Sequence, residues 1–150
     1  MIGAGVADTA TLSLAEEVGR RLAAAGCAVV TGGLGGVMEA ASRGASLAGG
    51  LVIGILPTPS VGDANPFVDI PIATGMGDAR NVIIASTAEA FVAVGGAYGT
   101  LSEIAFALKR GKTVVSLGSW RPDDAVKVAS SPEEAVRLVL GGAVGSIASD

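Results

Sequence analysis

The stretch CAVVTGGLGGVMEAASRGASL, residues 27–47, decides the fold of this chain. It opens with an apolar run from Cys27 to Thr31 that has the length and composition of a buried strand. Gly32 to Gly36 then form a glycine-rich turn, and from Val37 to Leu47 apolar residues recur at helical spacing. A strand that passes through glycines directly into a helix is the repeating unit of parallel α/β sheets.

The alternation of strands and helices continues on both sides of this stretch. Ser13 and Glu16 have the spacing of a capping box, Gly26 ends the helix that follows, and Ser131 with Pro132 starts the last helix. Helices are predicted over Leu14 to Ala25, Arg80 to Ala88, Thr100 to Arg110 and Pro132 to Leu140, strands over Leu51 to Leu56, Val68 to Ala73, Ala90 to Val94 and Thr113 to Leu117, and a proline-rich loop over Pro57 to Pro66. The pattern predicts a three-layer, Rossmann-like α/β fold, a mainly parallel sheet with helices on both faces, in one domain spanning residues 1–150.

Two strand predictions are irregular. Pro71 confines the segment from Val68 to Ala73 to an edge of the sheet or to an irregular stretch, because proline cannot donate a ladder hydrogen bond. Met1-Ile2 is too short to predict a first strand, although Gly3-Ala-Gly5 resembles the turn that follows one. This mismatch suggests that a few residues precede Met1 in the full protein.

Composition and charge exclude several classes of protein. No apolar run approaches the roughly 20 residues that span a bilayer, and no secretion signal is present, so a cytoplasmic protein without membrane contact is expected. The net charge is −4 without a cluster of Lys or Arg, which disfavours nucleic acid as a partner. Cys27 is the one cysteine and is expected to be a buried structural thiol. Because charged residues are scarce, a homodimer or homotetramer is expected.

Two glycine turns are candidate anion sites. Thr31 to Val37 and Gly95 to Thr100 each join a strand to a helix, which places free backbone N–H groups and the positive helix end at one point. Both turns lie at the carboxyl edge of the predicted sheet, where ligands of such sheets bind. A ligand bearing a phosphate is therefore expected between them, although a purely structural role for the first turn stays open.

The chemistry available at this edge is limited. No glycine turn has the complete fingerprint of a dinucleotide-binding site, so NAD binding is disfavoured. None is followed by Lys-Ser or Lys-Thr, so a P-loop NTPase is excluded. The chain has no histidine, which removes histidine-dependent triads, and no metal site is predicted. Glu103, at the start of its helix, and Arg80 are the candidate reactive groups. The simpler alternatives are a helix-dipole partner for Glu103 and a solvated surface side chain for Arg80.

Three ordered motifs resemble a known family. They are TGGLGGVMEAASRGA at residues 31–45, TGMGDARN at 74–81 and GGAYGTLSE at 95–103. In these motifs the chain resembles the LONELY GUY (lysine-decarboxylase-like) superfamily, nearest to the molybdenum cofactor carrier branch and its bacterial relatives. The hydrolase branch of that superfamily has Pro, Gly and Lys where this chain has Gly95, Ala97 and Asn81.

The resemblance implies a ligand site and two alternative functions. The implied ligand-binding residues are Gly32, Gly33, Gly35, Gly36, Met76, Arg80, Asn81, Gly95, Gly96, Ala97, Tyr98, Gly99, Thr100 and Glu103. As a carrier, the chain would bind a phosphorylated pterin or nucleotide, with no cofactor required beyond a bound nucleotide monophosphate, phosphate or molybdopterin-type ligand. As a nucleoside 5′-monophosphate phosphoribohydrolase, it would release base and ribose 5-phosphate, with Glu103 and Arg80 catalytic. An inert oligomeric domain is the third alternative.

Overall fold

The strands and helices of the chain alternate from end to end. The computed structural model describes the backbone of residues 1–147 and the side chains of residues 1–141. The strands are Ile2–Gly3 (β1), Val29–Thr31 (β2), Val52–Leu56 (β3), Ile70–Ala73 (β4), Ala90–Val94 (β5), Thr113–Leu117 (β6) and Lys127–Val128 (β7). The α-helices are Thr9–Ala24 (α1), Val37–Leu47 (α2), Arg80–Thr87 (α3), Tyr98–Lys109 (α4) and Pro132–Ile147 (α5), and short 3-10 helices cover Val61–Asp63 and Gly77–Ala79.

The strands form a parallel layer in two groups. One group has the order β2-β3-β4 and the other β1-β5-β6-β7, and every ladder in both is parallel. The groups meet where the Met1 amine donates to the carbonyl of Val30 at 2.8 Å. The parallel arrangement predicted from the sequence is confirmed, and β4, with Pro71, lies at an edge as expected.

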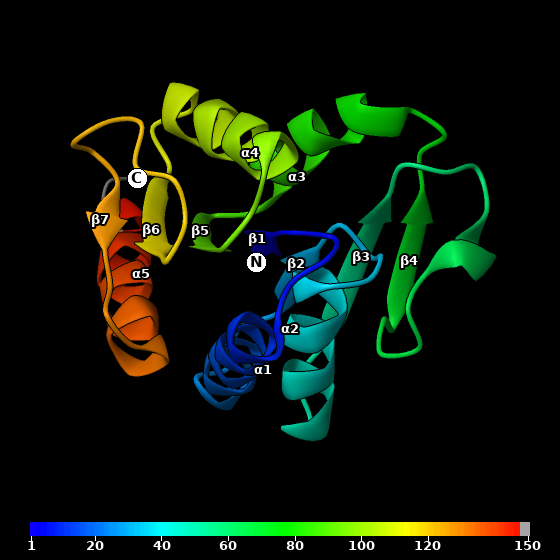
Figure 1. Cartoon of the computed structure of the whole chain (residues 1–150), viewed down its shortest axis with the longest axis horizontal. Coiled ribbons are helices and arrows are strands. Elements are labelled where there is room, and N and C mark those ends of the chain that lie inside the picture. Colours follow the sequence, from blue (N-terminus) through cyan, green and yellow to red (C-terminus); the bar gives the residue numbers. More distant parts are fainter. Residues whose placement is uncertain (148–150) are drawn as a thin grey trace.

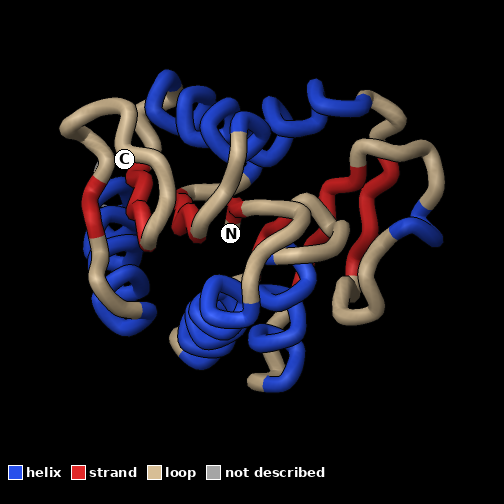
Figure 2. The backbone as a smooth tube through the Cα atoms, in the orientation of Figure 1, coloured by secondary structure: helices blue, strands red, loops and turns tan. Residues whose placement is uncertain are grey.

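Helices cover both faces of this layer (Figures 1 and 2). The helices α1, α2 and α5 lie on one side, and α3 and α4 on the other. Side chains that alternate along β5 contribute to the hydrophobic cores on both faces of the sheet. Val92 and Val94 pack in the cluster with α1, α2 and α5, while Phe91 and Ala93 pack in the cluster with α3 and α4. The three-layer architecture is therefore confirmed.

Several predicted boundaries were wrong. Helix α1 begins at Thr9 rather than Leu14, because the carboxylate of Asp8, not Ser13, caps it by accepting from the N–H of Thr11 at 2.7 Å. Helix α4 begins at Tyr98, so Gly99 belongs to the helix rather than to the turn. Helix α5 runs to Ile147, beyond the expected end at Leu140.

The strands at the two ends of the second group were missed. Ile2–Gly3 does form a strand, paired in parallel with Ala93 and Val94 of β5. Two residues are too few to show a periodicity, so this strand can be recognised only from its pairing with β5. Strand β7, paired with β6, is equally short and exposed.

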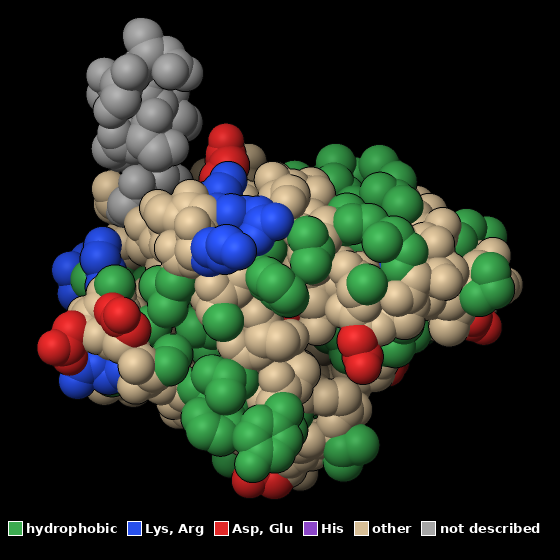
Figure 3. Space-filling model, turned by 90° about the horizontal axis from the view of Figure 1, so that it is seen from above, with side chains coloured by type: hydrophobic (Ala, Val, Ile, Leu, Met, Phe, Trp, Pro, Cys, Tyr) green, Lys and Arg blue, Asp and Glu red, His purple; other side chains and the backbone are tan. Residues whose placement is uncertain are grey.

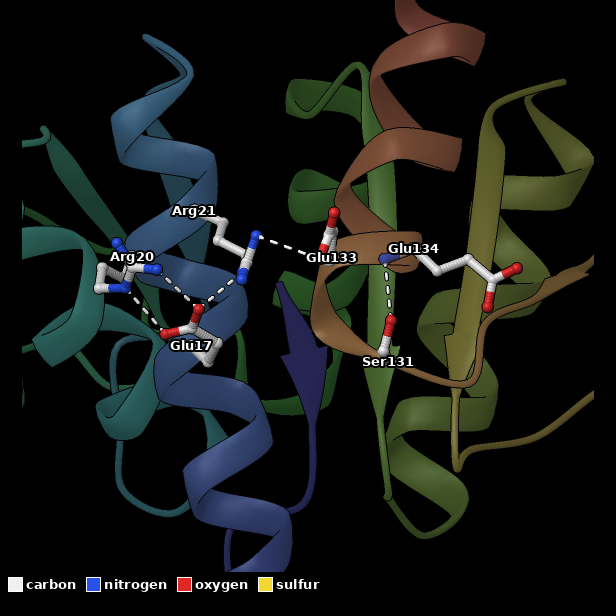
Figure 4. Close-up of polar contacts among 6 residues, drawn as sticks. All are labelled: Glu17, Arg20, Arg21, Ser131, Glu133 and Glu134. Atoms are coloured by element: carbon white, nitrogen blue, oxygen red, sulfur yellow. Dashed lines mark hydrogen bonds and ion pairs between the residues drawn. The ribbon is translucent and has the colours of Figure 1, made fainter.

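Helices α1 and α5 lie side by side, with an exposed polar seam between them (Figure 4). Glu17 pairs with Arg20 and Arg21, and Arg21 approaches Glu133 of α5 at 3.9 Å. Ser131 caps α5, as expected, by accepting from the N–H of Glu134 at 3.1 Å. These ion pairs are solvated and contribute little to stability.

The face of the molecule that carries α3 and α4 shows many hydrophobic side chains, with Lys and Arg gathered towards one end (Figure 3). Among the described residues, no helix combines the length and the hydropathy needed to cross a membrane.

Candidate functional site

A cleft of about 180 Å³ opens at the carboxyl ends of β1 and β5. Three segments wall it: the turn Gly3 to Gly5 after β1, the stretch Asp78 to Asn81 that leads into α3, and the first turns of α4 with Ala97, Gly99, Thr100 and Glu103. Met38 of α2 closes one side. The carboxyl edge is where ligands of parallel α/β sheets bind, as predicted.

The N-terminus of α4 lies at this cleft, and in the part of the chain that the structure describes no side chain of its N-cap residue caps it. Ala97 precedes the helix in extended conformation and makes no side-chain capping hydrogen bond, and no acidic residue lies in the first turn. The first N–H groups of a helix lack partners inside the helix and carry its positive partial charge. This end of α4 therefore suits an anion such as phosphate.

Glycines shape the turn before α4 for different reasons. Gly95 and Gly96 have φ of +58° and +112°, and a Cβ on Gly96 would collide with the side chain of Thr100. Gly99, in contrast, has open space where a Cβ would lie. Only the first two glycines are needed for the turn to fold. At Gly99 the missing side chain instead leaves space in the cleft.

We expect Gly99→Ala to leave the fold intact and to raise the free energy of unfolding by about 0.5–1 kcal/mol, because alanine loses less backbone entropy in a helix. Gly96→Ala is the matched control and should lower the free energy of unfolding by about 1–2 kcal/mol. Its positive φ disfavours alanine, and the added Cβ would collide with the side chain of Thr100. Urea denaturation of both variants measures the two effects. Destabilisation by Gly99→Ala would show that there is no free space for a Cβ at this position.

The segment after β6 holds the turn from outside. Ser119 donates its hydroxyl to the carbonyl of Gly95, and the indole N–H of Trp120 donates to the carbonyl of Ala97 at 3.1 Å. Trp120 also stacks on Tyr98, with ring centroids 5.9 Å apart. These two hydrogen bonds fix the backbone of the turn that leads into α4.

Replacing Ser119 with Ala removes one of these two supports. We expect a loss of about 1 kcal/mol in the free energy of unfolding, the usual contribution of one hydrogen bond, together with weaker anion binding at the turn. Ser130→Ala is a control outside the lining of the cleft, since its hydroxyl also bonds to a neighbour, the carboxylate of Glu134. Thermal unfolding and phosphate titration check both variants, and unchanged binding by Ser119→Ala would contradict the supporting role.

Glu103 is a buried carboxyl group in the cleft. Its residue is 7% exposed, and burial raises its pKa to about 7, while the charges of Arg80 and of the Met1 ammonium lower it. Because α4 begins at Tyr98, Glu103 lies in the second turn of the helix and is not the helix-dipole partner that was the simpler alternative. A carboxyl group with this pKa can hold or release a proton near neutral pH.

Arg80 is fixed by protein atoms rather than solvated. Its Nη1 donates to the carbonyls of Gly32 and Ile55, both at 2.6 Å, and its Nε donates to the side-chain oxygen of Asn81 at 2.9 Å. Burial lowers the pKa of Arg80, and the charges of Glu103 and Asp78 raise it. The guanidinium thus joins the first glycine turn to the cleft and places positive charge beside Glu103.

Asn81 continues this connection to α4. Its side-chain NH₂ donates to the hydroxyl of Ser102 at 3.2 Å, and that hydroxyl donates to the carbonyl of Gly99 at 2.7 Å. Asn81 is 6% exposed. A chain of hydrogen bonds therefore runs from Arg80 to the first turn of α4 and fixes their relative position.

The first glycine turn packs beside the cleft and is not among its lining residues. Gly32 packs on Arg80 and Met38, Gly33 on Leu56, and Gly36 on the backbone of the turn after β1, so that a Cβ at any of them would collide. The N–H of Val37, at the start of α2, already bonds to the carbonyl of Ala4. These contacts favour a structural role for this turn, and its part in ligand binding stays a prediction.

Of the expected site residues, Arg80, Asn81, Ala97, Gly99, Thr100 and Glu103 come together in the cleft. Gly32, Gly33, Gly35, Gly36, Met76, Gly95, Gly96 and Tyr98 do not line it. Sequence reasoning missed Gly3, Ala4, Gly5, Met38 and Asp78 as lining residues. The turn from Gly3 to Gly5 carried the signal, because a turn that follows a first strand must reach the same sheet edge.

Comparisons with known proteins agree with this architecture. Residues 1–141 match the SLOG cluster4 family. A protein of Archaeoglobus fulgidus is 49% identical over 144 residues, which make up 96% of this chain and 95% of that protein. The molybdenum cofactor binding protein of Rippkaea orientalis superposes with a TM-score of 0.87 at 38% identity, covering 99% of this chain and 94% of its own. The molybdenum cofactor carrier protein MCP of Chlamydomonas reinhardtii has a TM-score of 0.85 at 38% identity, covering 95% of each chain. The Rossmann-like fold class is thereby confirmed.

Proposed function

The chain belongs to the SLOG cluster4 family, and we propose that it is a carrier-type protein that binds a phosphorylated pterin of the molybdenum cofactor kind, with the phosphate at the N-terminus of α4. The observation that carries this proposal is the uncapped start of α4, which opens into the cleft beside Arg80 and Glu103. The similarity to two molybdenum cofactor proteins, each at 38% identity, supports the choice of ligand class.

The size of the cleft limits how the ligand binds. At about 180 Å³ it is smaller than the roughly 300–1,000 Å³ of pockets that enclose a whole drug-sized ligand. The cleft therefore receives the phosphate end, and the ring system lies towards the open side. Partial enclosure is suited to a carrier, which must release its ligand to another protein.

Protonation of Glu103 favours anion binding. A phosphate at the start of α4 would face Asp78 and Glu103 as well as Arg80. With its pKa near 7, Glu103 is half protonated at neutral pH, and the uncharged form repels phosphate less and can donate a hydrogen bond to it. Binding should weaken as the pH rises through 7.

The test is the ligand content of the protein itself. The chain is produced in a bacterial host that makes molybdenum cofactor, isolated quickly, and denatured under oxidising conditions, so that any bound pterin becomes fluorescent. We expect pterin fluorescence above that of an unrelated protein treated in the same way. Equal fluorescence in the two samples contradicts the proposal.

A phosphoribohydrolase is the second candidate, and one observation favours it. A buried carboxyl group with a pKa of about 7 lies in the same cleft as a fixed guanidinium, an arrangement that can activate water or stabilise a positively charged sugar. Incubation with AMP and with N6-modified AMP tests this activity by release of free base. Release that falls at least about 100-fold in Glu103→Gln supports a hydrolase, whereas no release by the wild type leaves the carrier.

A further inference from the structure

The loop between β3 and β4, residues 57–69 (Figure 1), is bonded near both of its ends to the segments that hold Arg80. Near its start, two of its carbonyls accept hydrogen bonds from the N–H groups of Gly75 and Gly77, at 3.0 and 2.9 Å, in the stretch that leads to Arg80. Near its end, Asn65 bonds to the first glycine turn, and a carbonyl of that turn accepts from Arg80. The loop therefore joins two parts of the backbone on which the place of the guanidinium depends.

Asn65 is a buried polar residue outside the lining of the cleft, with 9% of its surface exposed. Its side-chain Nδ2 donates to the carbonyls of Gly33 and Leu34, at 3.3 and 3.0 Å, and its backbone N–H donates to the same carbonyl of Gly33 at 2.8 Å. Its side-chain oxygen accepts from the N–H of Phe67 at 3.1 Å. Both ends of the amide are therefore bonded, the NH₂ group across to the turn and the oxygen within its own loop.

The first glycine turn does not fix the direction of its own carbonyls. Gly32 and Gly33 are consecutive, and Gly33 has a φ of +77°, so the peptide units beside it have more rotational freedom than those beside other residue types. The hydroxyl oxygen of Thr31 accepts from the N–H of Gly33 at 3.0 Å and holds the first of these peptide units. The carbonyl of that unit belongs to Gly32 and accepts from Arg80. Asn65 holds the second unit through the carbonyl of Gly33.

We propose that Asn65 is a positioning residue of the cleft, which acts through the first glycine turn to set the guanidinium of Arg80. The other acceptor of Nη1, the carbonyl of Ile55, lies within β3 and is placed by the sheet. The carbonyl of Gly32 is placed by the turn, so the support of the turn decides where Nη1 is held. The value of this position for anion binding rests on the proposed function, whereas the hydrogen bonds themselves do not.

The direction of a change in the pKa of Glu103 distinguishes positioning from simple loosening of the fold. The charge of Arg80 lowers this pKa, so a displaced guanidinium should raise it above its value of about 7, by about 0.5–1. A cleft that merely opens to water would lower it, because burial is what raises it. The Met1 ammonium also lowers this pKa and is the same in every variant. Carbon-13 NMR titration of the carboxyl groups measures the pKa without any ligand.

Asn65→Ser is the variant of choice, because a serine hydroxyl can still accept from the N–H two residues on but does not reach the two carbonyls of the turn. Ser60→Ala is the matched control, since it removes a hydrogen bond of 3.2 Å with Gly62 inside the same loop. We expect a higher pKa of Glu103 in Asn65→Ser and the wild-type pKa in Ser60→Ala. Asn65→Leu, which keeps the side-chain volume, should raise the pKa as well and serves if the serine variant does not fold. An unchanged or lowered pKa in the folded variants would overturn the proposal.

Phosphate titration measures the consequence for the cleft. The affinity for inorganic phosphate should be at least about threefold lower in Asn65→Ser than in Ser60→Ala. Equal affinity of the two variants, if both bind phosphate, would also overturn the proposal. A wild type that does not bind phosphate contradicts the proposed function instead, and the pKa of Glu103 then decides the role of Asn65.

Discussion

Replacing Glu103 with Gln raises the free energy of unfolding by about 3 kcal/mol at about pH 9 and changes it little at about pH 4. Burial raises the pKa of this carboxyl from 4.5 to about 7 in the folded chain. Each tenfold change in proton affinity corresponds to about 1.4 kcal/mol. Between these two values the folded chain holds a proton that the unfolded chain releases, so the contribution of Glu103 to stability is lost as the pH rises to 7. Glutamine cannot ionise and does not lose it.

Urea denaturation of both proteins across this pH range measures the difference. The Met1 ammonium acts in the opposite sense between pH 6 and 8, because its pKa is lowered from 8.0 to about 6, but it is present in both proteins. Glu133→Gln is the control, since this side chain is 77% exposed and its change should stay within about 0.5 kcal/mol at either pH. An effect of Glu103→Gln that does not depend on pH would contradict the burial of its charge.

Replacing Arg80 with Met lowers the free energy of unfolding by about 2–4 kcal/mol and abolishes binding in the cleft. The guanidinium holds the carbonyls of Gly32 and Ile55 and orients Asn81. Methionine fills a similar volume but leaves these carbonyls without their donor. The change also removes a charge that lowers the pKa of Glu103, so that pKa should rise further.

Arg80→Lys separates charge from geometry. Lysine keeps the positive charge but lacks the planar set of donors that reaches three acceptors at once, so it should recover only part of the stability. Arg121→Ala is the control, because among the described residues this exposed arginine pairs with Asp124 alone and its loss should cost less than about 0.5 kcal/mol. Chemical denaturation and phosphate titration check the series. A stable Arg80→Met protein that binds normally would show that the guanidinium does not hold the cleft together.

Much of the fold could be predicted from the sequence, because it depends on local signals. The strand, glycine turn and helix at residues 27–47 and the apolar runs of β3, β5 and β6 carry their periodicity within themselves. Strands β1 and β7 carry no such periodicity, because each has two residues and is defined only by its pairing with the neighbouring strand. The predicted start of α1 was wrong because Asp8 and Ser13 are both good caps, and in the structure it is Asp8 that accepts the capping bond from the N–H of Thr11.

The candidate site could be predicted in part, because several of its residues lie just after the carboxyl ends of strands. Glu103, Arg80 and Thr100 come together because their segments leave the sheet at one edge. The first glycine turn was assigned to the ligand on its composition, and in the structure its glycines pack closely against Arg80, Leu56 and Ala4. Only three-dimensional contacts distinguish these two uses of glycine. Oligomerisation stays a prediction for light scattering to test.

Binding of a phosphate-bearing pterin at the start of α4 is central to the proposed function. Native mass spectrometry of the wild type and Gly99→Ala, isolated side by side from a host that makes molybdenum cofactor, tests it most directly. Gly99 has open space and faces the cleft, so the added methyl group narrows the anion site without unfolding the chain. We expect a phosphorylated pterin adduct on the wild type and a loss of at least about tenfold in its occupancy on a fully folded Gly99→Ala. A wild type without any adduct, or equal occupancy of the two proteins, would contradict the claim.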